Sequence, residues 1–211
     1  MSPLPHLTDC GLPGIKDIPY GVHMCHFYER REDLAAALVL YFAAGLRNNE
    51  RGIWITAEPL GAAAALAELR KAGLDVEAAI RKGSLVVRDY SEWYAEAGAL
   101  KGKEIVDLWL AEEERALAQG YAGLRIAGNV AFVTPETWQV FMEYEETLNR
   151  VLQGRRIVTL CSYQLGRCGA SEVLEVVRRH DCTLDHPDGG WQILTSRAGQ
   201  AGKLRTSRPR A

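Results

Sequence analysis

The stretch HMCHFY at residues 23–28, followed by the long apolar segment 33–46, decides how we expect this chain to fold. Side chains of an extended segment alternate between two faces, so His23, Cys25 and Phe27 share one face and the other three residues share the opposite one. An imidazole and a thiol side by side suit metal binding, a polarised thiol or a hold on a polar ligand. The alternative is a core with unusual residues, because free cysteines and aromatic residues are often simply buried.

Helix-forming and strand-forming segments alternate along the chain. Residues 33–46 are almost continuously apolar, which indicates a buried helix, and 52–56 is a short run of the buried-strand type. Thr134 as N-cap and Pro135 in the first turn mark another helix start. We expect helices over 33–46, 60–72, 103–119, 135–152 and 170–180, and strands over 52–56, 84–88, 123–127, 156–160 and 189–194. This order predicts an α/β fold of three layers, a mostly parallel sheet with helices on both faces.

The bulk composition excludes several classes of protein. The chain has 211 residues and a net charge of −2, so it is long enough for one domain and has no basic surface for nucleic acid. It has no run of roughly 18 apolar residues for a membrane span, and its start lacks a secretory signal. Its five cysteines are widely spaced, which indicates free thiols in a reducing cytoplasm. We expect an irregular lead-in over 1–20, a single domain over 21–196 and a disordered basic tail over 197–211.

Short motifs along the chain follow one another in an order that resembles a known family. They include His-x-Cys-x-Phe-Tyr-Glu at 23–29, Trp-Ile-Thr-Ala-Glu-Pro-Leu at 54–60, Glu-Trp-Tyr at 92–94, Tyr-Glu at 144–145 and Leu-Cys-Ser-Tyr at 160–163. This order is similar to that of the MEDS family, the methanogen/methylotroph (DcmR-type) sensory domain, over roughly residues 20–195. The resemblance implies a distant relation to the RecA/KaiC-type nucleotide-binding fold.

A phosphate loop precedes the first long helix in that fold, and here it would fall near residues 20–31. Such a loop needs backbone amides freed by glycines and a lysine, in the pattern Gly-x-x-x-x-Gly-Lys-Ser/Thr. Residues 20–31 do not contain that pattern, and 123–129 lacks the carboxylate that would hold magnesium. We therefore expect a RecA/KaiC-like fold without a Walker A loop, and no ATP as a cofactor.

The candidate site residues come from segments far apart in the sequence. Ligands of doubly wound sheets gather at the carboxyl ends of the strands, so we expect Cys25, Glu58 and Cys161 to approach one mouth there. Each has a structural alternative: a helix N-terminal carboxylate for Glu58 and a small core residue for either cysteine. Arg125, inside a strand pattern, needs an acidic partner, either Glu145 or another acid. The candidate ligand-binding residues are His23, Cys25, Phe27, Tyr28, Glu58, Trp93, Tyr94, Glu145, Cys161 and Tyr163.

The resemblance favours a non-catalytic sensory domain for a small, partly apolar molecule, a one-carbon or hydrocarbon derivative, in bacterial signalling or transcriptional regulation. Phe27, Trp54 and Trp93 would supply apolar walls, and His23, Cys25, Glu58, Glu145 and Tyr163 the polar anchors. Family members are often fused to DNA-binding or kinase modules. We find neither in this sequence, so we expect a separate signalling or DNA-binding partner, or a homodimer.

Two other functions remain open. In the first, His23, Cys25 and Cys161, with Cys168 or His180, bind zinc or iron or act as a redox or electrophile sensor. No repeated Cys-x-x-Cys pair supports this. In the second, Cys25 beside His23 is the nucleophile of a thiol enzyme, although no oxyanion-hole motif is legible.

Overall fold

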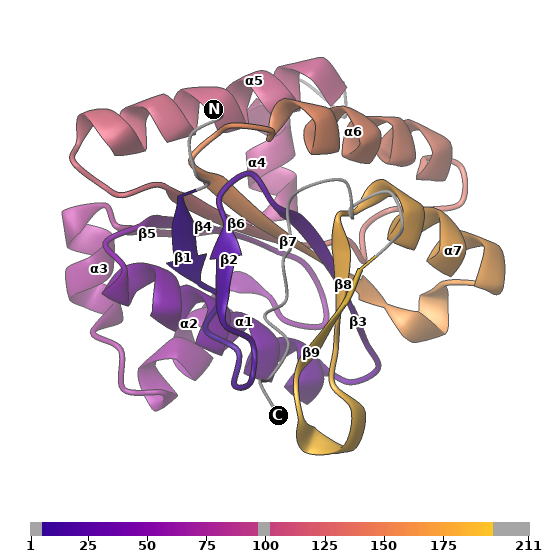
Figure 1. The fold of residues 1–211 in the computed structure, drawn as a ribbon, viewed down its shortest axis with the longest axis horizontal. Coiled ribbons are helices and arrows are strands. Elements are labelled where there is room, and N and C mark those ends of the chain that lie inside the picture. Colours follow the sequence, from indigo (N-terminus) through magenta and orange to yellow (C-terminus); the bar gives the residue numbers. More distant parts are fainter. Residues whose placement is uncertain (1–5, 97–101, 196–211) are drawn as a thin grey trace, which may run out of the picture.

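A seven-stranded sheet forms the centre of the computed structural model, which describes residues 6–96 and 102–195 (Figure 1). Its strands lie in the order β5-β4-β6-β7-β3-β8-β9, and all neighbours are parallel except β8 and β9. The strands are β3 (His23–Tyr28), β4 (Arg51–Thr56), β5 (Leu85–Asp89), β6 (Leu124–Asn129), β7 (Ile157–Gln164), β8 (Cys182–Asp185) and β9 (Gln192–Thr195). The three-layer α/β fold predicted from the sequence is confirmed.

Seven α-helices of the described chain cover both faces of this sheet (Figure 1). They are α1 (Arg31–Arg47), α2 (Ala62–Lys71), α3 (Val76–Lys82), α4 (Tyr90–Glu96), α5 (Gly102–Ala118), α6 (Trp138–Val151) and α7 (Ala170–Arg179). The first three bury their apolar side chains in one core, and the other four bury theirs in a second core on the opposite face. Two short 3₁₀ helices, Leu165–Arg167 and Pro187–Gly189, connect the last elements.

The HMCHFY stretch is β3, a strand inside the sheet with β7 on one side and β8 on the other. Its side chains alternate as the sequence predicts: Met24 and Tyr28 lie in the core under α1, whereas Cys25 and Phe27 lie on the side of α6 and α7. In register, Cys25 stands opposite Cys161 of β7 and Thr183 of β8. Both faces of β3 are therefore covered, and nearly all its side chains are buried.

Several expected boundaries differ from the structure. The lead-in expected to be irregular contains a two-stranded antiparallel sheet, β1 (Leu7–Asp9) with β2 (Asp17–Pro19). Helix α6 begins at Trp138 rather than at residue 135, because the Thr137 hydroxyl first closes a turn by accepting a hydrogen bond from the Thr134 backbone N–H, at 3.0 Å. The short α3, α4 and β8 were not expected, since propensity is weak evidence for such elements.

The C-terminal tail expected over 197–211 lies outside the described residues. Within the described part, no helix is long and apolar enough to cross a bilayer.

Candidate functional site

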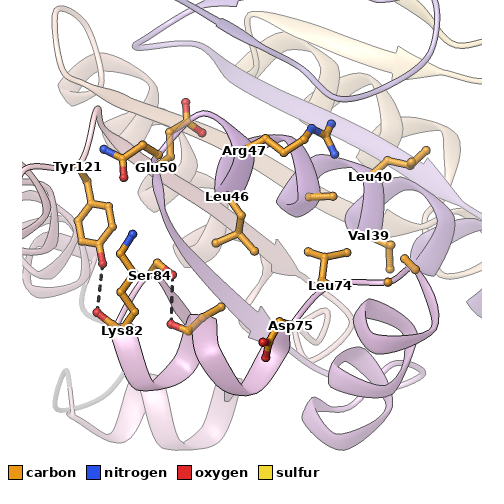
Figure 2. A pocket seen from close by; sticks show the side chains of 15 residues that line it. Val39, Leu40, Leu46, Arg47, Glu50, Leu74, Asp75, Lys82, Ser84 and Tyr121 are labelled. Atoms are coloured by element: carbon orange, nitrogen blue, oxygen red, sulfur yellow. Dashed lines mark hydrogen bonds between the residues drawn. The ribbon is translucent and has the colours of Figure 1, made fainter.

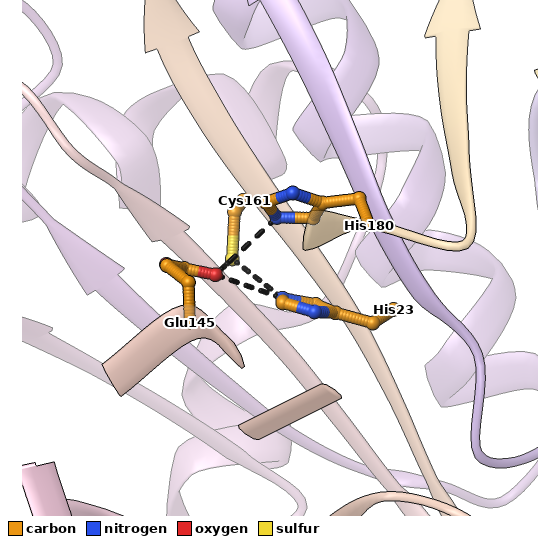
Figure 3. A group of neighbouring side chains, drawn as sticks. All are labelled: His23, Glu145, Cys161 and His180. Atoms are coloured by element: carbon orange, nitrogen blue, oxygen red, sulfur yellow. Dashed lines mark hydrogen bonds and ion pairs between the residues drawn. The ribbon is translucent and has the colours of Figure 1, made fainter. Parts of the chain in front are cut away.

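Four polar side chains from separate elements meet beneath α6 and α7 (Figure 3). We call them the His/Glu/Cys cluster: His23 at the start of β3, Glu145 of α6, Cys161 of β7 and His180 just after α7. Glu145 Oε2 lies 3.0 Å from His23 Nε2, 3.3 Å from His180 Nε2 and 3.7 Å from Cys161 Sγ. His23 Nε2 is 3.4 Å from Cys161 Sγ, and all four donor atoms lie within 4.8 Å of one another.

Backbone pairing fixes these side chains. Parallel pairing of β3 with β7 places His23 two residues before the register partner of Cys161, on the same face of the sheet. Asp181 then joins α7 to β3, because its backbone N–H donates to the His23 carbonyl at 2.8 Å and its carboxylate accepts from the His23 N–H at 3.0 Å. His180, one residue earlier, is thereby held against the ring of His23, with the two ring centroids 4.0 Å apart.

The four side chains of the cluster are buried, and they shift one another's pKa values. Burial alone would raise the pKa of Glu145, but hydrogen bonds from His180 and His23 outweigh it and lower that pKa to about 2. Burial and the neighbouring His180 lower the pKa of His23, and burial with the charge of Glu145 raises the pKa of the Cys161 thiol well above its usual value. The cluster thus combines an ionised carboxylate, a neutral imidazole of His23 and a protonated thiol. Glu145 Oε1 makes no hydrogen bond to the described residues.

A small cavity of about 20 Å³ borders this cluster. The polar residues among those that line it are Glu145, Thr159, Cys161 and Asn129. The remaining wall is aliphatic and aromatic, formed by Ile55, Tyr94, Trp109, Ile126, Ala127, Gly128, Val130, Phe132, Phe141, Tyr144 and Leu148. An apolar enclosure with a few convergent polar groups is the usual make-up of a small-molecule site.

A wider groove of about 440 Å³ lies at the carboxyl ends of β6 and β7. Tyr163, Trp138 and Cys168 are among its lining residues, and Val130 lines both this groove and the small cavity. The ring of Tyr163 also lies 5.9 Å from that of His180, edge to face. The groove therefore approaches the cluster from the sheet edge where ligands of such folds gather.

Another hollow lies on the opposite face, between α1 and the α2–α3 segment (Figure 2). It measures about 520 Å³, with Val39, Leu46 and Leu74 on its apolar side. Hydrogen bonds such as that from the Tyr121 hydroxyl to the Lys82 carbonyl, 3.2 Å, already satisfy part of its polar rim. None of the candidate site residues predicted from the sequence lines it, so its size does not make it the candidate site.

Two of the expected polar anchors lie outside the cluster. Cys25 is buried one strand away from Cys161, and its thiol faces the Thr183 hydroxyl at 3.2 Å. Burial raises the pKa of Cys25 to about 12, which opposes the reading of a polarised thiol beside His23. Glu58 is exposed at the end of β4. The expected meeting of Cys25, Glu58 and Cys161 at one mouth is therefore wrong.

The aromatic candidates are divided between the two faces. Trp93 stacks on Trp109 in the α4–α7 core, whereas Tyr94 lines the small cavity itself. Phe27 lies beside Tyr163, with ring centroids 5.8 Å apart. Tyr28 points to the other face and donates its hydroxyl hydrogen to Asn129 Oδ1 at 2.8 Å. Trp54, expected as a third wall, also lies on that other face, stacked on Phe42. The alternation of side chains along β4 points Trp54 toward α1 and away from the small cavity.

Two residues of the site were missing from the predicted set. The sequence indicates His180 only as an optional zinc or iron ligand, and the tertiary fold brings it to His23. Gly128 had a signal in the sequence, since a glycine inside a strand often marks close approach by another group. A Cβ added at Gly128 would meet no atom within 4 Å, so the absent side chain leaves room in the cavity.

Comparison with known proteins gives the same classification. The model of the MEDS family, "MEthanogen/methylotroph, DcmR Sensory domain", matches residues 22–181. The transcriptional repressor DcmR of Methylorubrum extorquens is 28% identical over 176 residues, which are 81% of this chain and 62% of that protein. The chain thus spans less than two thirds of the length of this relative.

Two solved structures share the fold. The KaiC-like protein PH0186 of Pyrococcus horikoshii OT3 superposes with a TM-score of 0.60 at 16% identity, over 95% of this chain and 93% of that one. The flagellar accessory protein FlaH of Methanocaldococcus jannaschii gives 0.57 at 12% identity, over 94% and 92%. At these identities the likeness concerns the fold alone, and it confirms the RecA/KaiC-like prediction.

Proposed function

The chain belongs to the MEDS family of sensory domains, and we propose that its small cavity receives a small, partly apolar molecule such as a one-carbon or hydrocarbon derivative. A sensory or regulatory role follows from the family and from the similarity to a transcriptional repressor. The observation that supports the ligand class is the cavity itself, which is lined mostly by apolar side chains together with Glu145 and Cys161 of the His/Glu/Cys cluster.

Size supports a very small ligand. The cavity of about 20 Å³ is only slightly larger than the roughly 10–15 Å³ that one water-sized molecule requires. An apolar group would contact Trp109 and Phe132, and a hydroxyl, carbonyl or halogen would face Glu145 or Cys161. Ligands with a carbon skeleton of one or two atoms fit this description, and larger ones would require the walls to move.

Binding transmits a signal only when the ligand prefers one of two conformations. Helix α6 is the element best placed to respond, because it supplies Glu145, Phe141, Tyr144 and Leu148 to the cavity and packs against both α5 and α7. We propose that occupancy shifts α6 relative to the sheet, and that a separate DNA-binding or signalling protein, or a second copy of the chain, reads this shift.

The proposed role is non-catalytic. The thiols of Cys25 and Cys161 have raised pKa values, so neither is a ready nucleophile. The Gly-x-x-x-x-Gly-Lys pattern of a phosphate loop is absent from residues 20–31. We propose residues 21–196 as one sensory domain.

Thermal shift measurements test the ligand class. Methanol, ethanol and dichloromethane are added separately at millimolar concentration to the wild-type chain and to the Gly128→Ala and Gly166→Ala variants. The added methyl of Gly128→Ala fills the cavity, whereas Gly166 is exposed, and neither glycine has a left-handed backbone. We expect at least one compound to raise the Tm of the wild-type chain and of Gly166→Ala but not that of Gly128→Ala. Equal responses in all three proteins would refute the cavity as the binding site.

A further inference from the structure

The His/Glu/Cys cluster has the donor set of a metal centre. It offers two imidazole nitrogens, one carboxylate oxygen and one sulfur, which are the atom types that zinc and related divalent ions bind. Four of the six separations among these atoms lie between 3.0 and 3.7 Å, and all six are within 4.8 Å. Bonds of about 2.0–2.3 Å to one tetrahedral ion would place donor atoms roughly 3.3–3.6 Å apart. Four of the separations are therefore already near the spacing that one ion requires.

The orientation of His180 also fits a ligand. Its Nδ1 lies 2.7 Å from the Val176 carbonyl oxygen, and because a carbonyl only accepts, Nδ1 carries the hydrogen of this bond. In a neutral ring Nε2 then has the lone pair, and this atom faces Glu145 Oε2 at 3.3 Å. Metal-binding histidines commonly donate their second N–H to a backbone carbonyl in this way, which fixes the tautomer and the ring plane.

A positive charge among the four donor atoms would complete the cluster. The contact of 3.3 Å between His180 Nε2 and Glu145 Oε2 is favourable with a proton on the imidazole, as in a hydrogen bond to the carboxylate, or with a cation bound between the two atoms. A proton on His180 would bond only that pair of atoms. A metal ion would also bind His23 and Cys161, and the negative charges of the Glu145 carboxylate and a Cys161 thiolate would balance its charge of +2.

We propose that His23, Glu145, Cys161 and His180 bind one divalent transition-metal ion, and that zinc suits this four-donor set best. The set differs from the metal candidates expected from the sequence, since Glu145 enters it and Cys25 and Cys168 do not. Glu145 and Cys161 also line the small cavity, so the ion would stand at its wall. This inference goes beyond the proposed function and is tested without any small-molecule ligand.

Metal analysis of the full chain, purified without chelator, tests the proposal against matched variants. Cys161→Ser removes a proposed ligand, and Cys25→Ser changes its register partner, a buried cysteine outside the cluster. His23→Gln and His26→Gln form a second matched pair on one strand, because His26 lies on the opposite face. We expect one zinc equivalent in the wild-type chain and in both controls, and at least a tenfold lower occupancy in Cys161→Ser and His23→Gln. Occupancy below a tenth of an equivalent in every protein after zinc is supplied, or equal occupancy in each pair, would overturn the proposal.

Cobalt provides a readout that does not depend on a folded variant. Co²⁺ is added to metal-stripped wild-type protein, and absorbance is recorded. A stoichiometric titration with tetrahedral visible bands and a sulfur-to-cobalt band in the near ultraviolet is the expected result. A spectrum identical to aqueous Co²⁺ would overturn the proposal, and would agree with a protonated His180 instead. Either result leaves the thermal shift test of the cavity to be judged separately, since that test compares Gly128→Ala with Gly166→Ala.

Discussion

Each face of the sheet buries a cluster of charged side chains, the Arg125–Glu50 pair under α1 and the His/Glu/Cys cluster opposite it, and the two are built differently. Under α1, the guanidinium of Arg125 pairs with Glu50 at 2.5 Å. Its other nitrogens donate to backbone carbonyls of Cys10, Tyr41 and Asp9, and Glu50 also accepts from the hydroxyls of Thr8 and Tyr20. Donors meet acceptors throughout this Arg125–Glu50 network. In the His/Glu/Cys cluster, by contrast, two imidazoles and a thiol all approach one oxygen, Glu145 Oε2, while Glu145 Oε1 makes no hydrogen bond to the described residues.

The difference indicates which cluster is structural. A buried ion pair is tolerated when its remaining hydrogen-bonding groups are satisfied, and the Arg125–Glu50 network meets that condition with protein atoms alone. It also fastens the N-terminal segment of β1 and β2 to the domain, through Thr8 and Asp9. The His/Glu/Cys cluster leaves Glu145 Oε1 without a hydrogen bond to the described residues and has the donor set that we propose for a metal ion, so we assign it to function.

Arg125→Met should have the largest effect on stability. It leaves the carboxylate of Glu50 buried without its cation, which costs about 3–5 kcal/mol of unfolding free energy. Denaturant unfolding measures the loss. Lys103→Met, which breaks the exposed pair with Asp107, is the control and should cost far less, because solvent screens that pair. Comparable losses in the two variants would remove the structural assignment of the network.

Acid should destabilise the chain through His26, the histidine of β3 on the face away from the cluster. Burial lowers the pKa of His26 to about 4, against the opposing charge of Asp33, while His186 lowers it further and Asp185 raises it. The unfolded chain, with a pKa near 6.5, then binds more protons, so stability is complete above pH 6.5 and is lost as pH falls toward 4. Between pH 7 and 4.5 this amounts to about 2–3 kcal/mol.

The variant His26→Phe keeps a ring against Tyr28 and Trp191 and removes this titration. Urea unfolding at pH 7 and 4.5 should show an acid loss smaller by that amount than in the wild-type chain. An unchanged acid loss would mean that His26 is not held neutral by burial.

Removal of metal should destabilise only a chain with an intact His/Glu/Cys cluster. A ligand present at a hundred times its Kd stabilises the folded state by about 2.7 kcal/mol, so excess EDTA should lower the wild-type unfolding free energy by that order. Glu145→Gln loses the anionic oxygen donor, and EDTA should then have little effect. The Arg125→Met variant keeps the cluster and should respond to EDTA like the wild-type chain. A chelator effect of equal size in Glu145→Gln would place the metal elsewhere.

Gly45→Ala should destabilise although it lies in a helix, where alanine is normally favoured over glycine by about 1 kcal/mol. The new Cβ would lie 2.6 Å from Cδ and Nε of Arg125 and 3.1 Å from Glu50 Oε2. We expect a net loss of about 1–3 kcal/mol in thermal or denaturant unfolding. A gain in stability would show that Arg125 and Glu50 can move aside for the new methyl group without loss of unfolding free energy.

Gly128→Ala should have the smallest effect on stability, and of the opposite sign. The methyl enters open space and the backbone is not left-handed, so the entropy of the unfolded chain falls and the fold gains about 0.4–1 kcal/mol. Unfolding of the metal-stripped protein measures this. A loss above 1 kcal/mol would indicate that the cavity is already filled by its own walls.

Much of this molecule could be predicted from the sequence, where the signal was local. Long apolar periods and buried-strand runs gave the three-layer fold, and the alternation in β3 gave the right faces for His23 and Cys25. The sequence does not show which residues of one strand share a face of the sheet with which residues of another. Arg125 and Trp54 consequently face the α1 side, which gives Arg125 the partner Glu50 rather than Glu145. His180 could not be placed, because its position depends on how β8 pairs with β3.

Native mass spectrometry of the gently purified wild-type chain tests the central claim most directly. If the His/Glu/Cys cluster is a metal centre, the native mass exceeds the denatured mass by one divalent metal ion per chain, and the difference disappears in Cys161→Ser but not in Cys25→Ser. A native mass equal to the polypeptide mass after incubation with zinc would contradict the claim.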